Sequence, residues 1–87
     1  MTLPIYNFAF NSIDSGDRLH FVKLNITTKV TNTEESVGTI GDVIHVKDDF
    51  DSFELSLVDS EWMELINKSS GNSTLCYKRD VILVREI

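Results

Sequence analysis

Residues 18–31 carry the pattern that most narrows the fold, an alternation of apolar and polar side chains. Because successive side chains of a β-strand point to opposite faces, this pattern predicts one long strand with a buried face and a solvated face. Such strands are typical of antiparallel sheets that pack one face on a core. The expected buried positions are Val22, Leu24, Ile26, Thr28 and Val30, and the expected solvated positions are Lys23, Asn25, Thr27 and Lys29.

Five further segments are predicted to be strands, separated by polar turns. In the first, alternation places Tyr6, Phe8 and Phe10 on one face, and short connections predict a hairpin with the long strand around Gly16. Segment 37–47 contains Gly38 and Gly41, which indicate a bulge or a sharp bend. The predicted strands besides the long one are Ile5–Phe10, Val37–Lys47, Phe53–Val58, Ser73–Tyr77 and Val81–Val84, with "DDFD" at 48–51 as a turn.

A short helix is predicted over residues 61–68. Trp62, Leu65 and Ile66 have the i, i+3, i+4 spacing of one helix face. Ser60 is a suitable N-cap and Gly71 a suitable C-cap.

Length and element order together define the expected fold class. Eighty-seven residues suffice for a single domain, 1–87, with a modest core. The sequence predicts a mainly β protein: a small barrel or a strongly bent antiparallel sheet of five to six strands with one short helix. An α+β sheet with the helix packed on one face is the alternative.

Two stretches resemble SH3-like small β-barrels. They are "VGTIGDVIHVKDDFDSFELSLVD" at 37–59 and "CYKRDVILVRE" at 76–86, about half of the chain. The helix at 61–68 and the long strand depart from the simplest pattern of these barrels. The resemblance implies a fold and no function, because that superfold serves unrelated functions. The short, acidic chain also resembles small accessory proteins of phages and mobile elements, many of which inhibit a host enzyme or defence factor.

Charge and hydropathy limit the partners and the location. Fourteen acidic residues against eight basic ones give a net charge of −6. This charge disfavours direct binding to nucleic acid or to an anionic membrane and favours a partner with a basic surface. The chain has no apolar run long enough to span a membrane and no visible signal peptide, so a cytoplasmic location is expected, that of the host if the gene is viral.

No catalytic residue, metal site or cofactor is predicted. The single cysteine, Cys76, is expected to be a half-buried, inert thiol, and His20 and His45 fall in predicted strands. A calcium loop starting at Asp48 would need a glycine where Phe53 stands, and would need flanking helices. The protein is therefore expected not to be an enzyme.

The acidic stretch from 48 to 65 is the candidate partner-binding site. One interpretation is a recognition surface anchored by Trp62; the other is a solvated face, with Trp62 in the core. The residues assigned to partner binding are Asp48, Asp49, Asp51, Glu54, Glu61, Trp62 and Glu64.

The sequence therefore predicts a non-enzymatic interaction protein, an inhibitor that docks its acidic surface on a host nucleic-acid-binding or defence protein. The alternative is a small barrel that binds nucleic acid or nucleotides. It would stack bases on Tyr6, Phe8 or Tyr77, with Lys23, Lys29, Lys78 and Arg79 gathered on one face. A homodimer formed by pairing of exposed strand edges is left open beside a monomer.

Overall fold

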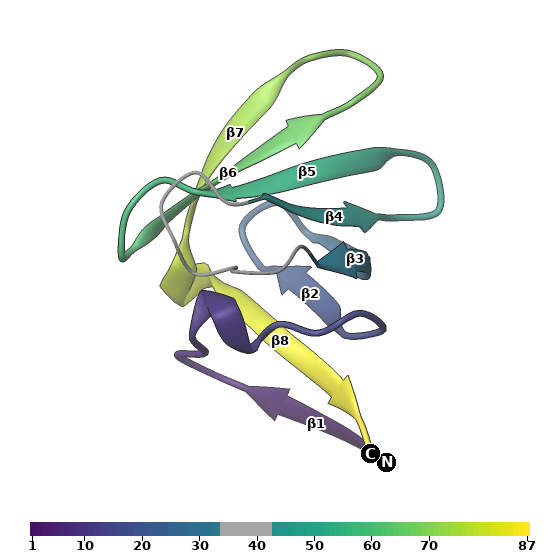
Figure 1. The fold of residues 1–87 in the computed structure, drawn as a ribbon, viewed down its shortest axis with the longest axis vertical. Coiled ribbons are helices and arrows are strands. Elements are labelled where there is room, and N and C mark those ends of the chain that lie inside the picture. Colours follow the sequence, from purple (N-terminus) through teal and green to yellow (C-terminus); the bar gives the residue numbers. More distant parts are fainter. Residues whose placement is uncertain (34–42) are drawn as a thin grey trace.

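A computed structural model describes residues 1–33 and 43–87, which form one open antiparallel sheet (Figure 1). Among these residues the sheet has eight strands in the order β1-β8-β2-β3-β4-β5-β6-β7, so β1 and β7 are its edges. The mainly β class is confirmed, whereas the count of five to six strands is wrong. The elements are β1 (Thr2–Ile5), η1 (Phe10–Ser12), β2 (Arg18–Phe21), β3 (Ile26–Thr33), β4 (Val43–Lys47), β5 (Ser52–Leu57), β6 (Trp62–Asn67), β7 (Ser73–Tyr77), η2 (Lys78–Asp80) and β8 (Val81–Glu86).

The core lies on one face of this sheet. Five strands each place a side chain there with no exposed surface, namely Leu19, Ile44, Leu55, Met63 and Leu83. The segment between β1 and β2 adds Phe8, Phe10 and Ile13 to the same cluster. Alternate side chains of the strands thus pack into one apolar layer on this face of the sheet. The N-terminal segment helps to cover that layer.

The predicted long strand is two strands, which corrects the interpretation of residues 18–31. Phe21 pairs with Ile26, and residues 22–25 form the turn of a hairpin. Asn25 has a φ of 53°, a left-handed conformation that Asn adopts more readily than most residues. Val22 and Leu24 are exposed. The buried residues are odd-numbered before the turn, Leu19 and Phe21, and even-numbered after it, Thr28 and Val30.

The N-terminal segment also differs from the prediction. β1 ends at Ile5, Tyr6 is exposed, and Phe8 and Phe10 are buried outside any strand. The expected hairpin around Gly16 does not form. The cause is β8, which inserts between β1 and β2 and pairs with both.

Residues 62–67 form strand β6, so the predicted helix at 61–68 is wrong. Met63 and Leu65 are buried with strand alternation, and β6 pairs with β5 on one side and β7 on the other. The local helix-like spacing is overridden by this pairing, a common outcome for short segments. The predicted cap residues serve turns instead: Gly71, with a φ of 76°, lies in the β6–β7 turn.

The other predicted strands and turns agree with the structure to within a few residues. β4, β5, β7 and β8 overlap the predicted segments, and 48–51 is a turn. The first part of the predicted strand Val37–Lys47, residues 37–42 with the bend at Gly38 and Gly41, lies outside the described residues.

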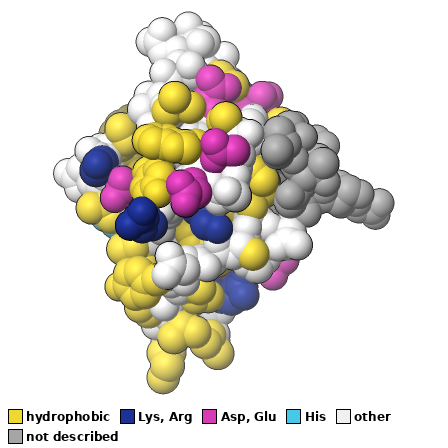
Figure 2. Space-filling model, turned by 90° about the vertical axis from the view of Figure 1, so that its left-hand side faces the viewer, with side chains coloured by type: hydrophobic (Ala, Val, Ile, Leu, Met, Phe, Trp, Pro, Cys, Tyr) yellow, Lys and Arg dark blue, Asp and Glu magenta, His cyan; other side chains and the backbone are white. Residues whose placement is uncertain are grey.

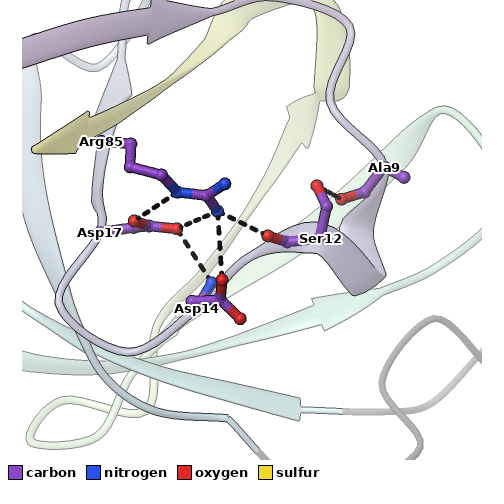
Figure 3. Close-up of polar contacts among 5 residues, drawn as sticks. All are labelled: Ala9, Ser12, Asp14, Asp17 and Arg85. Atoms are coloured by element: carbon purple, nitrogen blue, oxygen red, sulfur yellow. Dashed lines mark hydrogen bonds and ion pairs between the residues drawn. The ribbon is translucent and has the colours of Figure 1, made fainter. Parts of the chain in front are cut away.

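A charged cluster forms where Arg85 of β8 meets Asp14 and Asp17 of the turn before β2 (Figure 3). Arg85 donates two hydrogen bonds to the Asp17 carboxylate, at 3.0 and 2.7 Å, and one to the Ser12 carbonyl at 2.7 Å. The Asp14 amide also donates to Asp17, at 2.9 Å. Asp17 is buried, with 4% of its surface exposed, so its charge depends on these donors. The cluster therefore joins β8 to the turn that precedes β2.

This cluster predicts a dependence of stability on pH. Burial by itself raises the pKa of Asp17, but the hydrogen bonds from Arg85 and Asp14, with the Arg85 charge, outweigh it and lower that pKa. Because the folded-state pKa is below the unfolded value of about 3.9, the carboxylate stabilises the fold above that pH. This stabilisation is lost as the pH falls through the folded pKa. Asp17→Asn is expected to flatten the fall of the unfolding free energy below about pH 4.

Urea unfolding at several pH values between neutral and strongly acidic conditions measures this slope. Asp49→Asn, a change at an exposed turn carboxylate, is the matched control and should keep the wild-type slope. Equal slopes for Asp17→Asn and wild type would contradict the assignment.

Candidate partner-binding surface

The structure separates the seven predicted partner-binding residues into different places. Residues 48–51 form the β4–β5 turn and residues 58–61 the β5–β6 turn, at opposite ends of β5 (Figure 1). Six residues of strand correspond to roughly 20 Å. Asp48, Asp49 and Asp51 are therefore far from Glu61 and Trp62. The acidic residues do not form one continuous surface.

Glu54 and Glu64 lie between these two turns, on the face of the sheet away from the core. Glu54 pairs across strands with His45 and Ile66, and Glu64 pairs with Ser56 and Leu75. Glu64 is two residues from Trp62 on the same strand, so both project from the same face. The structure thus brings together Glu61, Trp62 and Glu64.

Two of the turn carboxylates are engaged by the backbone. Asp48 accepts hydrogen bonds from the amides of Asp51 and Phe50, which lower the pKa of its carboxyl. Asp59 likewise accepts from the amides of Glu61 and Trp62, at 2.8 and 2.9 Å. Such side-chain caps are typical of turns, so these two carboxylates have a structural role.

Trp62 and Tyr77 form a braced aromatic pair on the outer face. Their ring centroids are 4.8 Å apart in an edge-to-face arrangement, and 39% of Trp62 is exposed. The Tyr77 hydroxyl donates to the Glu61 carboxylate at 3.0 Å and accepts from the Arg79 guanidinium at 2.8 Å. Arg79 also lies over the Tyr77 ring, 4.9 Å from its centroid. We call Glu61, Trp62, Glu64, Leu75, Tyr77 and Arg79 the Trp62 patch.

A hollow of about 410 Å³ adjoins the Trp62 patch. Trp62, Leu75 and Tyr77 of β6 and β7 line it together with Lys23 and Leu24 of the β2–β3 turn. Its lining also includes the buried residues Phe21, Cys76 and Val81. The side of the molecule with the β5–β6 turn faces the viewer in Figure 2, where apolar side chains gather among acidic and basic ones. The hollow is thus an apolar recess with a charged rim.

The sequence analysis missed Leu75 and Tyr77 as members of this surface. Leu75 is 59% exposed although it lies in a strand. Alternation along β7 is the signal that could have found them. Cys76 and Thr74 pair with the inward-facing Met63 and Leu65, so Leu75 and Tyr77 point to the outer face.

The residues considered for catalysis take structural positions. His20 bonds the Thr27 hydroxyl across the β2–β3 hairpin at 2.8 Å, and His45 contacts the Lys68 ammonium at 2.9 Å. Cys76 is buried, and this burial, together with the Asp80 charge, raises the pKa of its thiol. Within residues 1–33 and 43–87, no three His, Cys, Asp or Glu side chains are arranged to hold a metal ion.

Three of the four basic residues proposed for nucleic-acid binding lie in or beside η2, namely Lys23, Lys78 and Arg79. Lys23 pairs with Asp80 at 3.5 Å, Lys78 lies 5.9 Å from the centroid of the Phe8 ring, and Lys29 lies in β3. Phe8 is 3% exposed, so it cannot stack on a base. A different basic row does occur, because Arg18, Lys29 and Lys47 are direct cross-strand neighbours. Asp48 and Asp49 line the same hollow as this row and offset its charge.

No family model, curated protein or solved structure matches this chain. The resemblance to SH3-like barrels therefore stays a prediction. None of the helices in the described part of the chain is long and apolar enough to span a bilayer.

Proposed function

We propose that the chain is a non-enzymatic protein-binding domain that holds a basic partner at the Trp62 patch. The observation that carries this proposal is the exposed Trp62 ring held against Tyr77. Trp and Tyr are the residues that most often dominate binding energies, because they bury much area with little loss of conformational entropy. Here the hydrogen bonds from Tyr77 to Glu61 and from Arg79 to Tyr77 fix the pair before a partner arrives.

The acidic residues have two roles in this proposal. Glu61 and Glu64 lie beside Trp62 and would contact Lys or Arg side chains of the partner directly. Asp49, Asp51 and Glu54 lie farther away and would act through long-range attraction, which mainly raises the association rate. The net charge of −6 supports a basic partner.

Within this class we propose an inhibitor encoded by a phage or mobile element, acting in the host cytoplasm. Its target would be a nucleic-acid-binding or defence protein, because such proteins present basic grooves. The support is the small size and acidic charge of the chain, together with one prominent aromatic anchor on its surface.

Trp62→Ala is expected to weaken binding of the partner about 30-fold, which corresponds to a hot-spot residue. Most of the loss should appear in the dissociation rate. The partner is obtained by affinity capture from host lysate, identified by mass spectrometry, purified, and measured by biolayer interferometry.

Phe50→Ala is the matched control. Phe50 is 91% exposed and aromatic, but lies in the β4–β5 turn at the other end of β5. Its loss should leave the affinity unchanged. Equal affinity of Trp62→Ala and wild type, or equal losses in both variants, would rule out the Trp62 patch as the binding surface.

A further inference from the structure

The two edges of the sheet are protected to different extents. Exposed strand edges invite pairing with other chains, and proteins commonly block them with proline or charge. β1 contains Pro4, which has no backbone N–H to offer. β7, with the sequence STLCY, contains neither proline nor a charged residue. Of the two edge strands, only β7 lacks a proline or a charged residue that would hinder pairing with another strand.

The backbone of β7 presents its hydrogen-bonding groups toward the open side. The amides of Lys78 and Asn67 donate to the carbonyls of Glu61 and Asn72, which fixes the phase of the β6–β7 ladder. In an antiparallel pair, bonded and non-bonded positions alternate. Thr74 and Cys76 therefore bond to β6, whereas the N–H and C=O groups of Leu75 point away from β6. Among residues 1–33 and 43–87, no strand pairs with that side of β7.

The hollow of about 410 Å³ lies beside this edge. Its lining includes Leu75, Cys76 and Tyr77 of β7 together with Lys23 and Leu24 of the β2–β3 turn.

We propose that β7 is extended by a strand of the bound partner, an extended segment with alternate apolar residues flanked by Lys or Arg. This mode of binding is β-strand addition, in which main-chain bonds give affinity and alternate side chains give specificity. Apolar residues of the segment would enter the hollow above Cys76 and Val81. The flanking cations would meet Glu61 and Glu64.

The negative charge of the protein favours a basic segment over a second copy as the strand that pairs with β7. β7 itself is neutral, but two copies would bring together surfaces that each belong to a chain of charge −6. A basic segment is attracted by the same surface. The inference rests on the proposed function, since it specifies how the Trp62 patch engages its partner.

A displayed library of random peptides, selected on the wild-type chain, supplies the probes. Enriched peptides are expected to alternate apolar residues and to carry Lys or Arg at their ends. Leu75→Pro is expected to weaken their binding about tenfold relative to Leu75→Ala, because both variants lose the side chain but only the first loses the outward N–H. The fold should survive, since that N–H is not part of the β6–β7 ladder.

N-methylated versions of an enriched peptide test the same bond on the unaltered protein. Methylation of alternate amides should abolish binding in one phase and preserve it in the other, because only one set of amides faces β7. Strand addition is overturned if no peptide is enriched, if Leu75→Pro and Leu75→Ala bind equally, or if both methylation phases bind.

Two further outcomes separate this inference from the proposed function. If the captured protein partner depends on Trp62 but binds Leu75→Pro as tightly as Leu75→Ala, the proposed function stands and strand addition fails. If sedimentation shows a wild-type dimer that Leu75→Pro converts to a monomer, a second copy occupies the edge and the proposal is wrong.

Discussion

Met63→Ala is expected to lower the free energy of unfolding by about 3 kcal/mol. Met63 has no exposed surface and packs where β5, β6 and β7 meet. Truncation removes apolar contacts and leaves a cavity that the surrounding strands can fill only in part. Chemical denaturation followed by Trp62 fluorescence and by circular dichroism would measure the loss.

Trp62→Ala is the control for this prediction, and it distinguishes strand from helix. In the strand, Met63 faces the core and Trp62 faces outward, so Trp62→Ala should cost far less than Met63→Ala. Had residues 61–68 formed the helix that their spacing suggested, Trp62 would be buried and the order of the two costs would reverse. Circular dichroism alone would follow the Trp62 variant.

Arg85→Met is expected to lower the free energy of unfolding by about 3 kcal/mol, because it leaves the buried Asp17 carboxylate with no cation and only the Asp14 amide as a donor. Asp17 loses two hydrogen bonds while its side chain stays 6% exposed. The Ser12 carbonyl loses its donor as well. Urea denaturation at neutral pH measures the effect.

Lys23→Met provides the contrast. Lys23 and Asp80 form an ion pair at 3.5 Å, but 79% of the Lys23 side chain is exposed. Exposed pairs contribute about 0–1 kcal/mol, so this variant should unfold almost like wild type. A loss for Arg85→Met as small as that for Lys23→Met would show that the Asp17 cluster does not anchor β8.

Short-range patterns predicted the central strands because their alternation reflects their burial. In β5, Phe53, Leu55 and Leu57 alternate with Glu54 and Ser56, and all three apolar residues are buried. The turn at 48–51 was equally local, since Asp48 bonds only to residues two and three positions away.

The errors arose where distant segments decide the structure. Residues 62–67 satisfy a helix spacing and a strand alternation at once, and only pairing with β5 and β7 chooses between them. The apolar run at 81–84 gave no indication of which strands it would pair with. In the structure this run lies in β8, which pairs with β1 and β2. Within 18–31, the adjacent apolar pair Phe21 and Val22 was the local sign of the turn.

The candidate site was predictable in part. Trp62 and its neighbours Glu61 and Glu64 were selected as one surface and do lie together. The remaining acids were adjacent in sequence but are separated by the length of β5, which a list of charges cannot reveal. Tyr77 and Leu75 join the surface through strand pairing, so sequence distance hid them.

The insertion of β8 between β1 and β2 also sets the order in which the chain can assemble. Thr2 of β1 pairs with Glu86 and Phe21 of β2 pairs with Val81, both in β8. These pairings of β1 and β2 can therefore form only after β8 has been synthesised. The hairpins from β2 to β7 link consecutive strands and have no such delay. Contacts of long sequence separation slow folding, because the intervening chain must be ordered first. Until β8 emerges from the ribosome, β1 therefore lacks the strand with which it pairs in the sheet.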